Sequence, residues 1–217
     1  MCRSWSRGRV CGACFERFAP AVVRCPRCAL TVHDASHCGD CLRDPPPFDR
    51  AVAAVDYTFP WDGLVAALKF RDALDLASAL ARRLAETVRE ADGAPPALVV
   101  PMPLGPARLR ERGYNQAWEL ARRVARHQGL PADARVLARP HDAPRQMSLP
   151  PERRALNVRG SFVVPVPARA RIRGRDVALV DDVMTTGATA REAARTLLEA
   201  GARSVQVWVA ARTPAAT

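Results

Sequence analysis

The sequence predicts an α/β protein with a mainly parallel central sheet, preceded by a small cysteine-rich domain. Short apolar runs typical of buried strands alternate with amphipathic stretches after residue 48, and every cysteine lies before Leu42. Strands that alternate with helices build parallel sheets with crossover helices. The 217 residues exceed one average domain of roughly 150 residues without reaching two, so one α/β domain with an appendage fits.

The elements of the α/β part follow from apolar periodicity. Ala97–Met102 and Val177–Val180 are continuous apolar runs, as expected for strands that a parallel sheet buries on both faces. Apolar residues recur every four positions from Leu76 to Val88, which gives one face of a helix. We therefore expect strands over 50–58, 97–102, 177–180 and 204–210, and helices over 64–70, 72–91, 115–127 and 189–200. Parallel sheets of this kind bind ligands at the carboxyl ends of their strands.

The net charge of +11 favours anionic partners such as phosphates or nucleic acid. Lys69 is the only lysine among 33 basic residues, so the others are arginines, and the abundance of arginine, alanine and proline indicates a coding bias. Each arginine therefore needs a local argument before it is assigned to a ligand. No stretch approaches the ~18 apolar residues of a membrane span and the start has no apolar signal core, so we expect a soluble, cytoplasmic protein.

Six of the seven cysteines form three Cys-x-x-Cys pairs. Two intervening residues allow a tight knuckle that aims both sulfurs at one point, and two knuckles supply the tetrahedral sulfur shell of Zn²⁺. Because the cysteine-rich segment is too short to form a hydrophobic core, we expect a metal ion to stabilise it. Nothing indicates secretion, which disfavours disulfides. We predict a zinc-ribbon domain over 1–44 with structural Zn²⁺ and the ligands Cys11, Cys14, Cys25, Cys28, Cys38 and Cys41.

The pairing of the knuckles is left open by the sequence. The second and third pairs make one complete site, and Cys11 and Cys14 then need partners from Cys2, His33 or His37. Alternatively the knuckles pair in an interleaved order. Three consecutive prolines at 45–47 form a stiff spacer, after which the second domain is expected over 48–217.

The segment from Val177 to Thr189 carries most of the predicted chemistry. Its apolar run delivers two adjacent carboxylates, Asp181 and Asp182, to the end of a strand, and a Thr-Thr-Gly-Ala-Thr turn opens the next helix. Gly187 permits a positive φ, and the turn's N–H groups and hydroxyls with the helix N-terminus suit a phosphate monoester. Carboxylates repel phosphate, so they are expected to accept hydrogen bonds from hydroxyls of the same ligand. A phosphorylated sugar with a vicinal diol fits both parts, whereas P-loop and Rossmann signatures are absent from the sequence.

This segment resembles the phosphoribosyl-pyrophosphate (PRPP) signature of type I phosphoribosyltransferases, and further elements resemble the ComF/GntX family. Those elements are Leu68-Lys69-Phe70, Arg108 with Arg112-Gly113-Tyr114-Asn115-Gln116, and Gln146, Leu149, Arg154 and Asn157. With the cysteine knuckles, the resemblance extends from Cys11 to Arg212. It departs from long family members at one leading Cys-x-x-Cys pair, where only Cys2 stands. The resemblance implies a type I phosphoribosyltransferase fold with an N-terminal zinc ribbon.

The resemblance also implies roles for individual residues. Asp181 and Asp182, the catalytic candidates, would hold the ribose 2′- and 3′-hydroxyls, and Thr185, Thr186, Gly187, Ala188 and Thr189 would hold the 5′-phosphate. Pro101 and Met102 would belong to the pyrophosphate loop, where a cis X–Pro bond is affordable. The remaining PRPP-binding candidates are Arg108 and Arg112 on the pyrophosphate, Arg154 on a flap over 139–157, and Lys69, which contacts the ligand or only extends along the surface.

The implied function is transfer of phosphoribosyl from PRPP, with Mg²⁺ accompanying PRPP, to an acceptor that the sequence does not identify. Two alternatives stand beside this enzyme. One is a non-catalytic competence or DNA-uptake factor that binds single-stranded DNA, or competence proteins, through its ribbon and arginines such as Arg24, Arg27 and those of 169–175. The other is a PRPP-sensing regulator.

Overall fold

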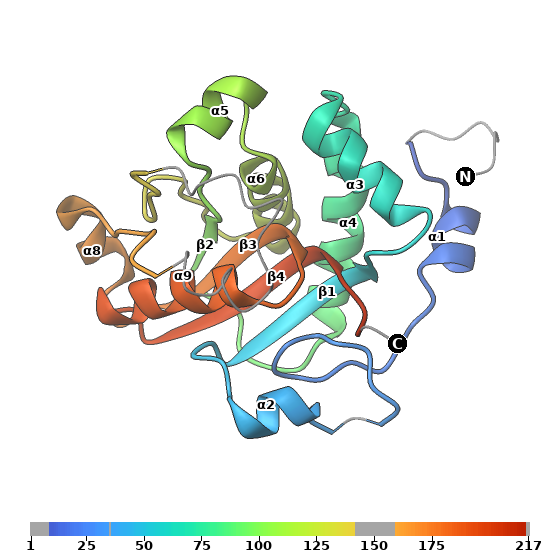
Figure 1. The fold of residues 1–217 in the computed structure, drawn as a ribbon, viewed down its shortest axis with the longest axis horizontal. Coiled ribbons are helices and arrows are strands. Elements are labelled where there is room, and N and C mark those ends of the chain that lie inside the picture. The colour runs from blue at the N-terminus through green and yellow to red at the C-terminus, as the bar shows by residue number, and fades with distance from the viewer. Residues whose placement is uncertain (1–8, 35, 142–158, 216–217) are drawn as a thin grey trace.

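The computed structural model describes residues 9–34, 36–141 and 159–215, which form a four-stranded sheet with helices on both faces (Figure 1). The strands are β1 (Arg50–Asp56), β2 (Leu98–Pro101), β3 (Asp176–Met184) and β4 (Ser204–Arg212). Their order is β1-β4-β3-β2 and every neighbouring pair is parallel, with Val177 of β3 opposite both Leu98 and Val205. The predicted fold class and its parallel sheet are confirmed.

Two hydrophobic cores lie on opposite faces of this sheet because its strands alternate their side chains. On one face Trp208 packs among α3 (Trp61–Phe70), α4 (Asp75–Glu90) and α6 (Gln116–Gln128). On the other, Val207 and Val209 pack against α8 (Val166–Ile172) and α9 (Ala188–Glu199). Burial on both faces explains why the central residues of these strands are largely apolar. The short helix α5 (Pro106–Arg112) projects from the sheet edge beyond β2 (Figure 1).

Some boundaries differ from the predicted ones. β3 continues to Met184, four residues past its apolar run, because its pairing with β4 persists to the Met184–Arg212 position. Asp181 and Asp182, predicted at the end of the strand, therefore lie within it. Residues 166–172 form α8, for which the sequence predicted no helix. Pro167 lies in its first turn, where proline is tolerated.

The cysteine-rich segment packs against the edge of the sheet at β1. It contains α1 (Gly12–Phe18) and α2 (Gly39–Arg43), and the Ala51 amide of β1 donates to the Pro26 carbonyl at 3.3 Å. The Phe15 ring stacks on Trp61 with centroids 5.2 Å apart, and Phe48, just after the prolines, is 1% exposed. The segment thus shares core residues with the α/β part. No helix in the described ranges is both long and apolar enough to span a bilayer.

Candidate functional site

The turn between β3 and α9 has the conformation expected of an anion-binding loop. Gly187 is the N-cap of α9 with φ 80°, in the left-handed region that glycine tolerates, which confirms the predicted positive φ. The Arg191 amide donates to the Gly187 carbonyl at 2.8 Å, so the helix begins directly after the turn. The first amides of a helix have no partners within it; here the Ala188 amide donates a long bond of 3.4 Å to the Thr186 hydroxyl, which a ligand could replace.

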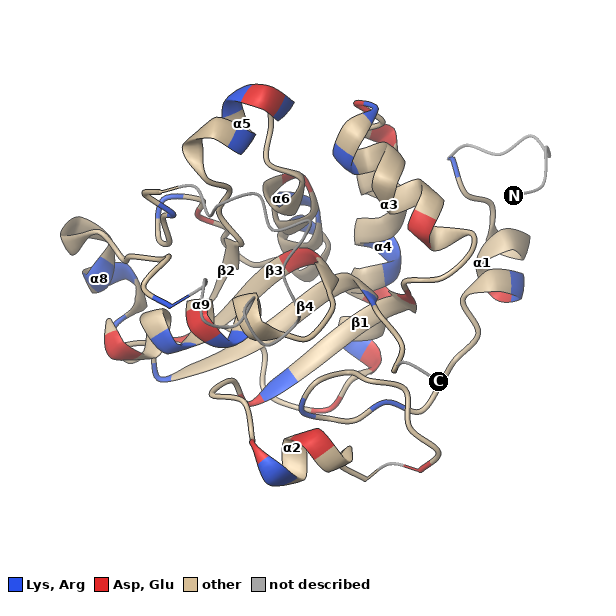
Figure 2. Cartoon of the chain, viewed as in Figure 1, with Lys and Arg blue, Asp and Glu red and all other residues tan. Residues whose placement is uncertain are grey.

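A small, partly open hollow of about 60 Å³ lies at this turn, at the carboxyl end of β3. The predicted phosphate-binding residues all line it, together with Asp181: Thr185, Thr186, Gly187, Ala188 and Thr189. Figure 2 shows that acidic and basic segments are interspersed over most helices, so overall charge does not single out a site. The hollow is distinguished by its combination of one carboxyl group with a turn rich in amides and hydroxyls.

The two adjacent acids point to opposite faces of the sheet, as consecutive strand residues do. Asp181 lines the hollow, whereas Asp182 is 4% exposed and its Oδ2 lies 3.1 Å from Lys69 Nζ. Burial raises the pKa of the Asp181 carboxyl to about 8; the negative charge of Asp182 adds to this and Lys69 opposes it. Near neutral pH this carboxyl is largely protonated, so it can donate as well as accept a hydrogen bond.

Contacts between the Leu68-Lys69-Phe70 element and the Arg-Gly-Tyr-Asn-Gln element hold Lys69 in place. The Tyr114 hydroxyl donates to the Leu68 carbonyl, and the Arg112 guanidinium lies 5.1 Å from the centroid of the Phe70 ring. The residues on either side of Lys69 are therefore fixed by the Arg-Gly-Tyr-Asn-Gln element. Neither contact was predicted, because the two motifs are far apart in the chain.

Asn115 joins the start of α6 to the end of β2. Its Oδ1 accepts from the Ala117 amide at 2.9 Å as the N-cap of the helix, and its Nδ2 donates to the Met102 carbonyl at 2.9 Å. The Met102 amide in turn donates to the Val180 carbonyl of β3 at 2.7 Å. An asparagine directly before an apolar helix is a recognised capping signal, but the second bond depends on the tertiary fold.

The other predicted PRPP ligands are placed as follows. Pro101 and Met102 are buried at the end of β2, and Arg108 is exposed on α5. Arg112 contacts Phe70 and donates to the Gln116 side chain. The suggested cis bond is not found at 101 or 103, since the cis X–Pro bond of the described residues is Phe59–Pro60. Arg154 lies outside the described residues.

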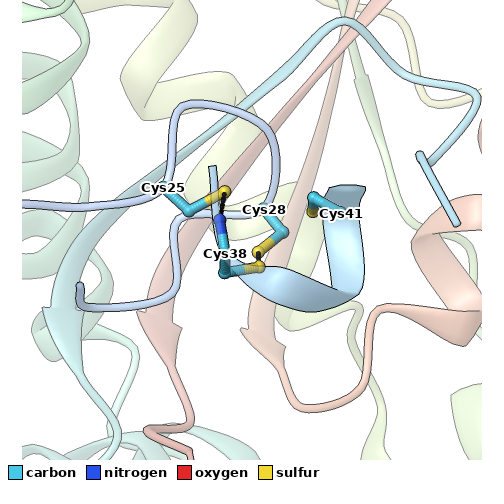
Figure 3. A group of neighbouring side chains, drawn as sticks. All are labelled: Cys25, Cys28, Cys38 and Cys41. Carbon is cyan, nitrogen blue, oxygen red and sulfur yellow. Dashed lines mark hydrogen bonds between the residues drawn. The ribbon is translucent and has the colours of Figure 1, made fainter. Parts of the chain in front are cut away.

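Four cysteines converge in the N-terminal segment (Figure 3). The sulfur atoms of Cys25, Cys28, Cys38 and Cys41 all lie within 4.8 Å of one another. The Cys28 and Cys38 sulfurs are 3.5 Å apart, and the Cys38 amide donates to the Cys25 sulfur at 3.4 Å. A tetrahedral zinc site with ~2.3 Å bonds needs sulfurs ~3.8 Å apart. This donor set therefore fits a metal ion such as zinc.

Amide hydrogen bonds favour the thiolate form of Cys25, whereas burial favours the protonated form of Cys28 and Cys41. Burial opposes ionisation of Cys25, but the amides of Cys38, Cys28 and Arg27 lower its pKa to about 7. Burial and the neighbouring Cys28 raise the pKa of Cys41. A metal ion displaces both protons, and the pre-arranged amides then stabilise the thiolates.

Cys11 and Cys14 lie apart from this cluster. Cys11 directly precedes α1, and Cys14 is buried in the core that α3 and α4 form. Across residues 9–34, 36–141 and 159–215, no metal-ligating group of three or more residues includes either of them. Their role as ligands stays a prediction, since Cys2 is not among the described residues. The clustering matches the first of the two pairing orders considered.

Arg212, the last residue of β4, links the cysteine cluster to the turn. It is 7% exposed, and its guanidinium donates to the carbonyls of Cys28, Met184, Thr185 and Thr213. The sequence assigned it no role, because an arginine at the end of an apolar strand resembles a surface residue. Arg191 in the first turn of α9 makes a second link through the Asp44 carbonyl at 2.6 Å.

The arginines considered for nucleic acid are partly engaged within the protein. Arg24 pairs with Asp56 at 2.7 Å, Arg27 donates to the Phe48 carbonyl, and Arg171 pairs with Asp133. Arg169, Arg173 and Arg175 are exposed.

Comparison with known proteins places this architecture in a family. Residues 71–217 match the phosphoribosyl transferase domain. The chain is 37% identical to the DNA utilization protein YhgH of Salmonella typhi over 209 residues, which cover 94% of this chain and 90% of that protein. It is 31% identical to Competence protein F of Haemophilus influenzae over 212 residues, covering 95% and 92%. The chain belongs to the ComF family.

Membership of the ComF family confirms the resemblance found in the sequence. Among solved structures, the glutamine PRPP amidotransferase of B. subtilis complexed with ADP and GMP is similar to this chain with a TM-score of 0.43 and 23% identity. That similarity covers 64% of this chain and 27% of the amidotransferase. The ComF-family domain is thus combined here with a four-cysteine cluster suited to a metal ion.

Proposed function

We propose that this ComF-family protein binds PRPP in the hollow at the end of β3 and transfers its phosphoribosyl group to an acceptor. The observation that carries the proposal is that one hollow is lined by Asp181 and by the whole turn from Thr185 to Thr189. The turn's amides and hydroxyls suit the 5′-phosphate, and the Asp181 carboxyl suits a ribose hydroxyl.

In the proposed reaction the bond from ribose C1 to pyrophosphate breaks, pyrophosphate leaves with the electron pair, and the acceptor forms a bond to C1. The transition state resembles an oxocarbenium ion, and the protein contributes positioning and charge neutralisation. Mg²⁺ bound to PRPP would neutralise part of the pyrophosphate charge. Zn²⁺ at the four cysteines would be structural.

Asp182 and Lys69 have supporting roles in this proposal. Lys69 pairs with Asp182 at 3.1 Å, and Asp182 is not among the residues that line the hollow. The pair places a cation near Asp181, which limits the rise of its pKa. We therefore assign ribose binding to Asp181 and positioning to Asp182, instead of giving both acids the same role.

Calorimetric titration with Mg·PRPP tests the binding site. The variant Asp181→Asn with Asp182→Asn should lose PRPP affinity by about tenfold, since it alters the Asp181 hydrogen bond to ribose, worth about 0.5–1.5 kcal/mol, and removes the charge that pairs with Lys69. Asp176→Asn is the matched control, because Asp176 lies on the same strand at its other end and pairs with Arg203. Unchanged affinity in the double variant would contradict the assignment.

Pyrophosphate release in the presence of candidate acceptors tests the transfer. Release that depends on both PRPP and an acceptor establishes an enzyme. PRPP binding without release, over a panel of nucleobases and oligonucleotides, would instead favour the PRPP-sensing regulator.

Single-stranded DNA binding is a second candidate function. It is favoured by the net charge of +11 and by the names of the relatives, which refer to DNA utilization and competence. The exposed arginines Arg169, Arg173 and Arg175 are better candidates than the internally bonded Arg24 and Arg27. Affinity for a labelled oligonucleotide should fall steeply with salt and fall further when these three are changed to glutamine. Salt-independent binding would argue against it.

A further inference from the structure

Arg212 is a buried cation whose described partners are main-chain carbonyls. Its Nε donates to the Cys28 carbonyl at 2.9 Å, and its Nη1 donates to the carbonyls of Met184 at 3.1 Å, Thr213 at 2.8 Å and Thr185. Cys28 belongs to the four-cysteine cluster, whereas Met184 and Thr185 lead into the phosphate-binding turn. One side chain therefore joins the two sites.

The charge of Arg212 points to the cysteine cluster as its counter-ion. Within the described part of the chain no acidic side chain forms an ion pair with Arg212. A buried cation without an anion is costly. Four thiolates around one Zn²⁺ carry a net charge of about −2. The metal-loaded centre would balance the charge of Arg212.

The two sites also share a cavity. Cys28, Cys38 and Cys41 line it together with Thr186 and Gly187 of the turn, and Arg212 is a lining residue too. Arg191 contacts Asp44 beyond α2, with its Nη1 3.2 Å from the carboxylate. The cluster and the turn are thus direct neighbours in space.

The contacts of Arg212 orient the turn through its peptide planes. In a planar trans peptide the C=O and N–H groups point in opposite directions. Holding the Met184 and Thr185 carbonyls toward Arg212 therefore directs the amides of Thr185 and Thr186 away from it. Both threonines line the hollow, and Arg212 does not. Arg212 thus fixes the amides that phosphate needs without touching the ligand.

We propose that Arg212 is a positioning residue that transmits metal occupancy of the four-cysteine centre to the phosphate-binding turn. Metal fixes the Cys25–Cys28 knuckle and with it the Cys28 carbonyl. Without metal, the Cys28 carbonyl is less firmly fixed as an acceptor for Arg212, and the hold of Arg212 on the Met184 and Thr185 carbonyls weakens. The metal-loaded protein therefore binds Mg·PRPP more tightly than the metal-free protein. This inference rests on the proposed function.

The test is a thermodynamic cycle on the full chain, loaded with Zn²⁺ or stripped by a chelator, with Mg·PRPP affinity measured by calorimetry. Metal removal should weaken binding to the wild type about 5-fold to 150-fold, the usual range for communication between sites. Arg212→Met should weaken binding to the loaded protein by a similar factor, and stripping this variant should add less than about 2-fold. Arg212→Lys should recover part of the metal response. If Arg212→Met fails to fold, Arg212→Lys carries the comparison.

Arg24→Met is the matched control. Arg24 donates to the Ala29 carbonyl at 3.1 Å and pairs with Asp56, so it anchors the same knuckle to the sheet without contacting the turn. This variant should keep both PRPP affinity and the metal response. Equal effects of stripping in the wild type and in Arg212→Met, or loss of the response in Arg24→Met, would overturn the inference.

Hydrogen exchange at the amides of 185–187 separates this inference from the proposed function. If the zinc-loaded wild type binds no PRPP, the proposed function fails. The inference about Arg212 still holds if metal removal speeds exchange at these amides in the wild type but not in Arg212→Met. Hydrogen exchange at these amides that does not change with metal in either protein would contradict the inference about Arg212.

Discussion

At the scale of single residues, Asp181 and Asp182 show how one strand separates two acids. Asp182 has a cation at 3.1 Å, whereas burial and the charge of Asp182 keep Asp181 protonated up to a pKa of about 8. The pair therefore supplies one fixed charge and one group that titrates near neutral pH. A protonated carboxyl in the hollow reduces repulsion of an incoming phosphate.

Asp181→Asn should make the protein more stable at alkaline pH. The folded pKa of about 8 lies above the ordinary 3.8, so the stability linked to this group is complete below about pH 4 and is lost as pH rises to about 8. Urea unfolding at pH 9 should show the variant to be more stable by at least about 1 kcal/mol, with a smaller difference at pH 5. If the difference in stability between Asp181→Asn and the wild type were the same at both pH values, the raised pKa of Asp181 would be contradicted.

Asn115→Asp should preserve most of the stability of the protein but weaken its binding of Mg·PRPP. Aspartate can still cap α6, whereas it cannot donate to the Met102 carbonyl. Asn115→Asp should thus cost less in urea unfolding than Asn115→Ala, which should cost about 0.5–2 kcal/mol. Both variants should weaken Mg·PRPP binding in calorimetry, because the end of β2 is no longer tied to α6. Full affinity in both would show that this tie does not serve the site.

At the scale of elements, the turn into α9 depends on one backbone conformation. Gly187 has φ 80°, and a Cβ placed there would lie 3.6 Å from the Met184 sulfur, an ordinary contact. The cost of a side chain at this position is therefore conformational rather than steric.

Gly187→Ala should destabilise the protein by about 1 kcal/mol and also weaken Mg·PRPP binding. Gly129→Ala is the matched control, because Gly129 has φ 68° with open space around it, at the end of α6. Thermal unfolding should show similar losses for the two variants. Calorimetry should show weaker binding only for Gly187→Ala, and equal affinities would mean that the turn's conformation is unimportant for phosphate.

Helices and strands were predictable where local pattern and tertiary context agree. The apolar periodicity of α4 and the continuous run of β3 sufficed, because both bury whole faces. The end of β3 was missed because its last residues are held by pairing with β4, which local sequence does not encode. Helix α8 was missed because it buries only Ala168 and Ile172, and the arginines between them leave no clear apolar periodicity.

The part of the candidate site that is contiguous in the sequence was predictable, and the contacts between distant segments were not. Asp181 and the Thr185–Thr189 turn are contiguous, so a single motif brought them together. The contacts of Tyr114 with Leu68, and of Arg212 with Cys28, join segments distant in sequence. No spacing rule relates such residues, and only the fold shows them.

At the scale of the whole molecule, the cysteine-rich segment is part of the α/β body. The stacking of Phe15 on Trp61 holds it against α3, and the Arg24–Asp56 pair holds it against β1. Loss of its metal should therefore affect the stability of the entire chain.

Cys41→Ser should remove one zinc ion per chain and lower the thermal midpoint. A thiolate ligand is lost from a buried cluster, and such sites contribute directly to folding. Elemental analysis and thermal unfolding measure the two effects. Cys14→Ser is the comparison, because Cys14 lies outside the four-cysteine cluster. Retention of zinc in Cys41→Ser would contradict the cluster, and loss of a second ion in Cys14→Ser would reveal another site.

The strand order has a consequence for how the protein is made. β1 pairs with β4, the last strand, and not with β2. On the ribosome the N-terminal knuckles emerge first and can fold around metal locally, while β1 waits with an unpaired edge until residues 204–212 leave the exit tunnel. Arg212 is the final residue of that strand, so the nascent chain can fix the turn into α9 only after all four strands have been synthesised.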